Sequence, residues 1–216
     1  MLALARTQDI AANEQATVHV IDDDVSLRDS LELLLPSVGL AVRTYVSVQE
    51  FLDAGAYDGP GCIVLDVRLP GISGLDFQSR SDGFGVHLPI VLMTGHSDVP
   101  MSVRAMKAGA VDFLPKPFRD QDMIDAITTA IERDRERRAA DTAAADVRER
   151  YASLSPREQQ VMTLVTAGKM NKQVAFELGL SEITVKTYRG AVMQKMAART
   201  FADLVRMADT LVPRDA

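Results

Sequence analysis

The sequence predicts an α/β domain, built on a five-stranded, parallel, doubly wound sheet, followed by a small all-α helix-turn-helix domain. Two observations carry this prediction. From Thr17 onward, short apolar strands alternate with helices, and Gly or Pro bounds each run, as in right-handed βαβ units. After residue 150 the pattern changes to a compact set of amphipathic helices. The length of 216 residues accommodates two such domains.

The first domain is expected to contain five strands and the helices between them. The strands are predicted at residues 17–22, 41–45, 62–65, 89–94 and 110–114. Helices are predicted at 26–38, after Ser47, at 99–108 and at 121–138. Between residues 76 and 86, Arg80, Ser81 and Gly83 interrupt the apolar stripe, so the helix there is predicted to be short or irregular.

The charge distribution supports two modules with different partners. Residues 1–150 carry 15 Lys and Arg against 24 Asp and Glu, a balance of −9, whereas residues 151–216 carry 9 against 6, a balance of +3. The predicted boundaries are a flexible tail at 1–16, a first domain at 17–131, a helical linker at 132–150 and a helical domain at 151–216. The linker is rich in charge and poor in core-forming residues, which favours an exposed helix or one that pairs with a symmetry mate.

Composition excludes several classes of protein. Hydrophobic residues make up 47% and charged residues 25%, which argues against a disordered or fibrous chain. No run approaches the roughly 20 apolar residues that a membrane span needs, so no membrane association is expected. The single cysteine, Cys62, argues against a disulfide framework and against a cysteine zinc site. A cytoplasmic location is expected.

Acidic, hydroxyl and basic residues end four of the predicted strands. Because the carboxyl ends of parallel strands meet at one edge of the sheet, these side chains are expected to converge. Clustered carboxylates repel one another unless a hard cation such as Mg²⁺ lies between them. A lysine and a hydroxyl beside them suit phosphoryl transfer to a carboxylate, and Asp66, alone at a central strand end, is the expected nucleophile. The residues are Asp22, Asp23 and Asp24, then Asp66, Thr94 and Lys116.

Simpler structural roles compete with this interpretation. Asp24 is as well placed to cap the N-terminus of the following helix. Taken alone, Thr94 is an ordinary strand-end hydroxyl, Phe113 a core residue and Lys116 a solvated loop residue.

The three histidines do not form a metal motif. His19, His87 and His96 are scattered along the chain, so structural or surface roles are expected for them. His96 follows Thr94 by two residues, and we hypothesise that it modulates access to the acidic residues.

Four motifs of the first domain resemble the receiver domain of two-component response regulators. They are VIDDD, LDVRLPGISG, MTGH and DFLPKPF, in order over roughly residues 17–130. The resemblance implies that Asp66 accepts a phosphoryl group from a sensor histidine kinase. It also implies that Asp22, Asp23, Asp66 and the backbone carbonyl of Arg68 bind Mg²⁺.

The same resemblance implies a switch. Thr94 and Lys116 would contact the phosphoryl oxygens, and Phe113 would turn inward as Thr94 moves toward them. A cis peptide before Pro117 is also expected from the family, and it would aim Lys116 into the site.

The second domain shows the pattern of a helix-turn-helix. Helices are predicted from Ser155-Pro156 to Gly168, and at 171–178, 184–196 and 201–211, with the turn at 177–181. Ser155 as N-cap and Glu158 three residues later form the pattern of a capping box. On helix 184–196, Lys186 and Arg189 are spaced to share a face and suit guanine edges or phosphates, and Gly190 permits close approach to DNA.

This pattern resembles the LuxR-type helix-turn-helix of the FixJ and NarL response regulators, through SPRE, NK-VA, the turn and TVK. The resemblance makes Lys186 and Thr187 candidates for base contacts, with Arg189 and Gly190 adjacent. Candidates for phosphate contacts are Asn171, Lys172, Thr184 and Lys195.

The expected function is that of a two-component response regulator. Phosphorylation would promote homodimerisation and binding to double-stranded promoter DNA, and would regulate transcription, with activation favoured and RNA polymerase as a further partner. The chain is not expected to be a metabolic enzyme, because its own chemistry would be limited to self-phosphorylation and phosphoaspartate hydrolysis. Two alternatives stay open: a phosphorylation-independent DNA-binding regulator with a vestigial receiver, and an adaptor whose C-terminal helices bind protein.

Overall fold

The computed structural model describes residues 15–55, 59–95 and 99–211 of the chain. The chain divides into two compact units, Met1–Arg138 and Ala139–Ala216, called here the first and second unit. Most of the predicted N-terminal tail lies outside the described residues. Its last residue, Ala16, is buried, and the Ala16 carbonyl accepts a hydrogen bond from the Ala41 amide, so it belongs to the first unit.

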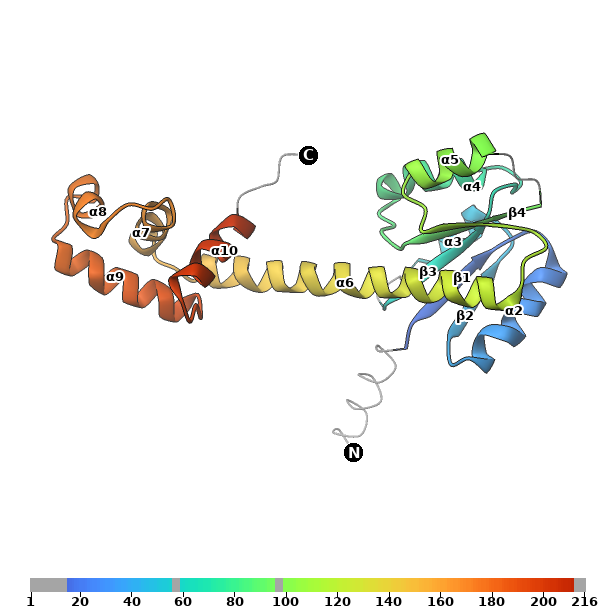
Figure 1. Cartoon of the computed structure of the whole chain (residues 1–216), viewed down its shortest axis with the longest axis horizontal. Coiled ribbons are helices and arrows are strands. Elements are labelled where there is room, and N and C mark those ends of the chain that lie inside the picture. Colours follow the sequence, from blue (N-terminus) through green and yellow to red (C-terminus); the bar gives the residue numbers. More distant parts are fainter. Residues whose placement is uncertain (1–14, 56–58, 96–98, 212–216) are drawn as a thin grey trace, which may run out of the picture. The chain divides into compact units, whose positions relative to one another are not determined.

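A five-stranded parallel sheet forms the centre of the first unit (Figure 1). The strand order is β2-β1-β3-β4-β5, which places β3 in the middle and confirms the predicted fold class. The strands are β1 (Thr17–Ile21), β2 (Ala41–Tyr45), β3 (Gly61–Asp66), β4 (Ile90–Thr94) and β5 (Asp112–Pro115).

Helices cover both faces of this sheet. Leu31 and Leu35 of one helix and Ile127 of another pack on one face, while Phe51 and Phe77 pack on the other. Figure 1 shows the same division for α2 and α6 on one side and α4 and α5 on the other. These helices are α2 (Val25–Ser37), α3 (Val48–Ala54), α4 (Gly74–Arg80), α5 (Val99–Lys107) and α6 (Asp120–Ala152).

The third of these helices is short, as the sequence predicts. After α4 the chain continues as a single 3₁₀ segment, Ser81–Phe84, which ends at Gly85 in the left-handed region at φ +71°. The polar and glycine residues of this stretch offer no second apolar turn to bury against the sheet.

Helix α6 includes the segment predicted as a helical linker, and the first part of that segment packs in the first unit. It runs without interruption for 33 residues, and the two units divide at Arg138, inside the segment 132–150. Asp134 of that segment is fully buried in the first unit and accepts a hydrogen bond from the Gly61 amide at 3.1 Å. Arg137 and Arg138 each donate to its carboxylate at 2.6 Å. The charged composition that resembles a solvated connector therefore includes a packed ion-pair cluster.

Four further helices build the second unit around its own core. Ser155 and Glu158 form the predicted capping box at the start of the first of them. Val161, Val185 and Val192 are fully buried at the centre of this unit. The helices are α7 (Pro156–Thr166), α8 (Asn171–Leu178), α9 (Glu182–Lys195) and α10 (Phe201–Leu211).

The turn between α8 and α9 has the expected helix-turn-helix form. Gly179 ends α8 in the left-handed conformation, at φ +65°, where a glycine avoids the strain that a Cβ would bring. Ser181 then caps α9, so that α9 begins two residues earlier than predicted. Within the described parts of the chain, no helix combines the length and the hydropathy needed to cross a membrane.

Candidate functional site

Three carboxylates meet at the carboxyl edge of the sheet. Asp22 and Asp23 follow β1 and Asp66 ends β3, and one oxygen of each lies within 4.8 Å of the others. The parallel register of β1 and β3 pairs Ile21 with Leu65, so the residues that follow emerge side by side. Asp22 is fully buried, Asp66 is 6% exposed and Asp23 is exposed. The cluster thus has a buried floor and one side open to solvent.

Lys116 supplies the positive charge of this cluster. Its Nζ lies 2.5 Å from Asp22 Oδ2 and 3.5 Å from Asp66 Oδ1. The Lys116 amide donates to the Thr94 carbonyl at 2.7 Å, which ties the lysine to the end of β4. The bond between Lys116 and Pro117 is cis, as the family pattern implies. The structure therefore brings the predicted lysine to the predicted acids.

The carboxylate oxygens at Asp66 and its two acidic neighbours suit the coordination of a divalent cation. In the described part of the chain, no group donates a hydrogen bond to the buried Oδ1 of Asp66. Burial raises the pKa of Asp66, the positive charge of Lys116 opposes this shift, and the negative charge of Asp22 adds to it. A set made of carboxylate oxygens, with one buried oxygen lacking a donor, suits a hard ion such as Mg²⁺. Receiver domains generally use Mg²⁺ at an acidic pocket of this kind.

Asp24 has the structural role that competed with a metal role in the sequence. Its Oδ1 accepts a hydrogen bond from the Ser26 amide at 2.9 Å, so it is the N-cap of α2. The Asp24 amide in turn donates to Asp22 Oδ1 at 2.9 Å, which orients the Asp22 carboxylate. Asp24 thus helps to position Asp22.

Two further candidates lie on neighbouring strands. Thr94 ends β4 and is fully buried. Phe113 of β5 is partly buried and packs against the core on the α3–α5 face. Arg68 is exposed in the turn that follows β3, which is where a backbone ligand next to Asp66 is expected.

Gly74 belongs to this site and was not singled out in the sequence. A Cβ at Gly74 would lie 2.2 Å from the backbone carbonyl oxygen of Asp66, which no other residue tolerates without movement of the backbone. The Gly74 amide also donates to the Val67 carbonyl at 3.0 Å. The only signal in the sequence is the glycine that closes LPGISG, and spacing alone does not show what approaches it.

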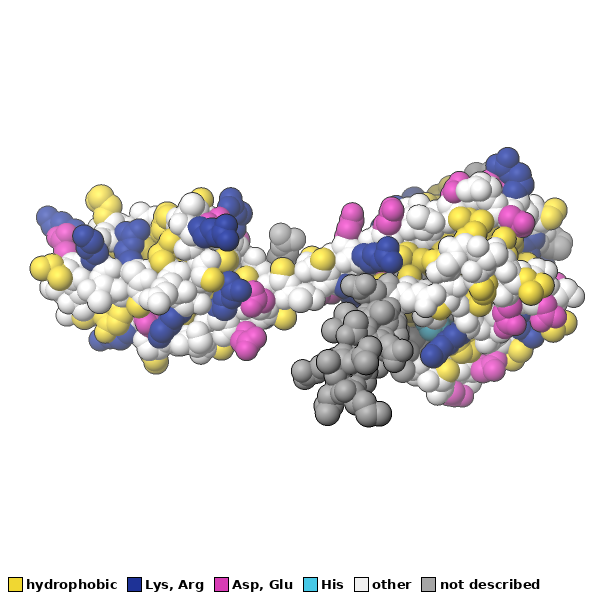
Figure 2. All heavy atoms as spheres, turned by 90° about the horizontal axis from the view of Figure 1, so that it is seen from below, with side chains coloured by type: hydrophobic (Ala, Val, Ile, Leu, Met, Phe, Trp, Pro, Cys, Tyr) yellow, Lys and Arg dark blue, Asp and Glu magenta, His cyan; other side chains and the backbone are white. Residues whose placement is uncertain are grey.

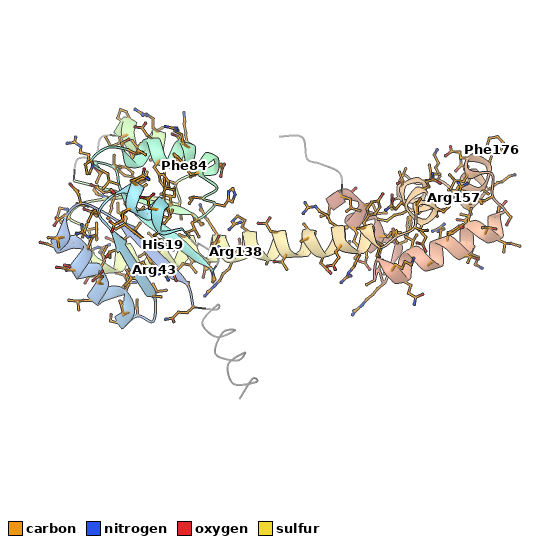
Figure 3. The ribbon with its side chains drawn as sticks, turned by 180° about the vertical axis from the view of Figure 1, so that it is seen from behind. His19, Arg43, Phe84, Arg138, Arg157 and Phe176 are labelled. Atoms are coloured by element: carbon orange, nitrogen blue, oxygen red, sulfur yellow. The ribbon has the colours of Figure 1, made fainter. Side chains whose placement is uncertain are left out.

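The histidines take structural and surface positions where they are described. His19 is 4% exposed, its Nδ1 lies 3.1 Å from the Tyr45 hydroxyl, and burial lowers the pKa of His19 to about 4, with the charge of Arg43 acting in the same direction. Figure 3 shows His19 and Arg43 on adjacent strands. His87 is exposed beside Asp82, and His96 lies outside the described residues.

In the second unit, α9 buries one face and exposes another. Val185 and Val192 are buried, whereas Lys186, Thr187 and Gly190 are exposed. Figure 2 shows Lys and Arg side chains spread among hydrophobic ones on the visible surface of this unit. An exposed polar helix face with a basic residue is the arrangement by which a recognition helix enters a major groove.

Arg189 does not share this exposed position with Lys186. It is partly buried, its Nη1 donates to Asn171 Oδ1 at 2.6 Å, and its guanidinium lies 5.2 Å from the centre of the Phe201 ring. The helical spacing that groups Arg189 with Lys186 does not reveal these partners on α8 and α10. Arg189 therefore joins three helices.

The remaining candidates for phosphate contacts differ in their surroundings. Lys172 is exposed in the first turn of α8. Thr184 Oγ1 lies 2.8 Å from the Ser181 hydroxyl at the start of α9. Lys195 forms an ion pair with Glu158 at 2.7 Å, and this contact is the main reason that the pKa of Glu158 is lowered.

Comparisons with known proteins assign a family to each of the two units. The model of the response regulator receiver domain matches residues 18–128, and that of the bacterial regulatory proteins of the luxR family matches residues 152–208. Nodulation protein W of Bradyrhizobium diazoefficiens is 56% identical over 200 residues, covering 93% of this chain and 88% of the relative. The transcriptional regulatory protein FixJ of Azorhizobium caulinodans is 48% identical over 195 residues, covering 90% and 92%.

A solved structure supports the same assignment. That of the response regulator StyR is 45% identical, with a TM-score of 0.78, and the match covers 90% of this chain and 98% of that one. Regulation that depends on phosphorylation is the mechanism of this family. The chain therefore belongs to the response regulators that join a receiver domain to a LuxR-type DNA-binding domain.

Proposed function

We propose that Asp66 is the phosphorylated residue, and that its Mg²⁺-dependent phosphorylation by a sensor histidine kinase promotes dimerisation and binding to promoter DNA. One observation carries this proposal: Asp66 places a buried oxygen, without a hydrogen-bond donor in the described chain, beside two further carboxylates and Lys116. A vestigial receiver has no need for such an arrangement of charges.

In the reaction, a carboxylate oxygen of Asp66 attacks the phosphorus of a kinase phosphohistidine. A P–O bond forms as the P–N bond breaks, and its electron pair returns to the imidazole. Asp22, Asp23, Asp66 and the Arg68 carbonyl would hold Mg²⁺, which neutralises phosphoryl charge when bound. Self-phosphorylation from small donors and hydrolysis of the phosphoaspartate belong to the same site. Lys116, 3.5 Å from Asp66, pairs with a phosphoryl oxygen, and Thr94 binds another.

The consequence is a change in the surface next to β5. As Thr94 turns toward the phosphoryl group, Phe113 fills the space that it leaves. Helix α5 exposes Val103 and Met106, 46% and 47% of their surfaces, and this apolar character supports pairing of two receivers there. Phosphorylation then shifts the population toward the receiver state that pairs.

The second unit supplies the output. Lys186 and Thr187 contact bases, with Arg189 and Gly190 adjacent. The residues that contact phosphates are Asn171, Lys172, Thr184 and Lys195. A dimer bound in the cytoplasm to two half-sites regulates transcription, in contact with RNA polymerase. Binding to DNA that weakens steeply with salt distinguishes this role from that of a protein-binding adaptor.

Light scattering tests the switch. Beryllofluoride imitates the phosphoryl group on a carboxylate, and with beryllofluoride and Mg²⁺ the wild-type chain should shift from monomer to dimer. Asp66→Asn should not shift, whereas Asp53→Asn, at an exposed acid that pairs with Gln49, should behave as wild type. A wild-type mass that is the same in both conditions would favour the regulator with a vestigial receiver.

A further inference from the structure

An apolar side chain is exposed at the start of α9. Ile183 lies in the first helical turn and 80% of its surface is accessible. Among the described residues, the core of the second unit includes its neighbours Leu180 and Tyr188 but not Ile183. Packing therefore does not account for an isoleucine at position 183. Helix propensity does not account for it either, because β-branched residues are less favourable in helices than unbranched ones.

The position of Ile183 follows from helical geometry. Ile183, Lys186, Thr187 and Gly190 are spaced i, i+3, i+4 and i+7, which places them on one face of α9. The Thr187 hydroxyl donates to the Ile183 carbonyl at 3.2 Å, one turn apart. Ile183 is thus the N-terminal member of the face that we propose enters the groove.

We propose that Ile183 contacts the C5 methyl group of a thymine in the major groove and thereby contributes to the choice of DNA sequence. This inference rests on the proposed DNA-binding role of α9. The thymine methyl is the one apolar group that base pairs present in the major groove, and apolar side chains recognise it. Lys186 and Thr187 on the same face supply donors and acceptors for the neighbouring base edges.

The surroundings favour DNA over a protein as the occupant. Ile183 is flanked on its face by a lysine and a threonine, both exposed, and such polar neighbours suit nucleic acid. The second unit also carries a positive balance of charge. Phe176, labelled in Figure 3, is more exposed at 89% but lies on α8, outside this helical face.

The test begins with DNA selected from a random library by the full chain in the presence of beryllofluoride and Mg²⁺. Each thymine of the selected site is then replaced in turn by deoxyuridine, which removes only the C5 methyl group. At one position in each half-site, the replacement should weaken binding about fourfold, the equivalent of about 0.8 kcal/mol for one buried carbon group.

The variants assign that effect to a residue. Ile183→Ser should bind thymine and uracil at that position equally, while Ile183→Val should keep part of the preference. Phe176→Ser, which removes an exposed apolar side chain from α8, should keep all of it. Because both residues are exposed, circular dichroism should show the same helix content in all three variants.

Two results would overturn the inference while leaving the proposed function in place. One is a wild-type chain that binds DNA but discriminates uracil from thymine nowhere in the site, and the other is an Ile183→Ser variant with an unchanged preference. A third result would reject the proposed role of α9 itself. If Lys186→Ala bound the selected DNA as tightly as wild type, both the role of α9 in DNA binding and the inference about Ile183 would fail.

Discussion

At the scale of single residues, Lys116 divides its charge unequally between two carboxylates. The 2.5 Å contact goes to Asp22, and the 3.5 Å separation from Asp66 is too long for a good hydrogen bond. Asp66, the nucleophile that we propose, therefore keeps an oxygen lone pair available, because the Lys116 ammonium pairs mainly with Asp22. The same lysine remains close enough to pair with a group added to Asp66.

His19 should make the stability of the first unit depend on pH. Its pKa is about 4 in the folded chain and about 6.5 when unfolded, so the unfolded state binds more protons between these values. The free energy of unfolding should accordingly fall as the pH is lowered from 7 to 4, by at most about 3 kcal/mol from this group. Urea unfolding, followed by the methyl NMR signals of Val18 and Val20, measures it.

The control for this prediction is a second histidine. His19→Gln should lose much of the slope with pH, because glutamine does not titrate, whereas His87→Gln, at an exposed position, should keep it. Differences between variants matter here, since the carboxylates titrate in the same range. Equal slopes in wild type and His19→Gln would contradict the prediction.

The sequence predicts which candidate residues meet when their positions depend on strand ends, but not when they depend on how helices pack. Asp22, Asp66 and Lys116 meet because parallel strands end at one edge, a consequence of the strand pattern. The contacts of Arg189 with Asn171 and Phe201 depend on how three helices pack, which helical spacing does not contain.

At the scale of elements, the sequence pattern predicts the strands, whereas the packing of α6 depends on contacts between residues far apart in the chain. Short apolar runs between turn residues predict all five strands to within about two residues. The extension of the first unit into the charged part of α6 depends on Asp134, whose partner Gly61 lies 73 positions earlier in the chain. A buried acid paired with two arginines has the composition of a solvated segment, so only the folded arrangement reveals it.

Asp134→Ala should destabilise the first unit by about 3 kcal/mol, because it leaves two arginines and the Gly61 amide without this acceptor. Urea unfolding followed by methyl NMR signals of the first unit measures the loss. Asp141→Ala, at an exposed acid on the same helix, should change stability by less than about 0.5 kcal/mol. An equal loss of unfolding free energy in the two variants would show that the buried contacts of Asp134 do not stabilise the first unit.

Gly190→Ala separates the stability of α9 from its binding to DNA. Gly190 is exposed, and outside its own helix no described atom lies within 4 Å of the position that a Cβ would take. Alanine should therefore stabilise the second unit by about 1 kcal/mol through helix propensity. The added methyl group should at the same time weaken DNA binding, if α9 approaches DNA as closely as we propose. Thermal unfolding and fluorescence anisotropy on one preparation measure both, and a gain in both quantities would reject the close approach.

At the scale of the whole molecule, the two units have separate cores, and we propose that phosphorylation of the first unit acts on the second by changing how many chains assemble on the DNA. Each chain carries one helix-turn-helix, so a single copy contacts one half-site of DNA. When two receivers pair, the second DNA contact becomes intramolecular, and its effective concentration rises without any new protein–DNA contact. Phosphorylation at the receiver can thus raise DNA affinity even if the DNA-binding surface itself does not change.

Activation should therefore depend on the number of half-sites in the DNA. Beryllofluoride and Mg²⁺ should increase the affinity of the wild-type chain at least tenfold for DNA with two half-sites, and by less than about twofold for DNA with one. Fluorescence anisotropy with labelled duplexes at fixed salt measures both, and Asp66→Asn should show neither increase. An equal increase on single and double half-sites would instead mean that activation uncovers the α9 surface within one chain, since pairing cannot improve binding to a single half-site.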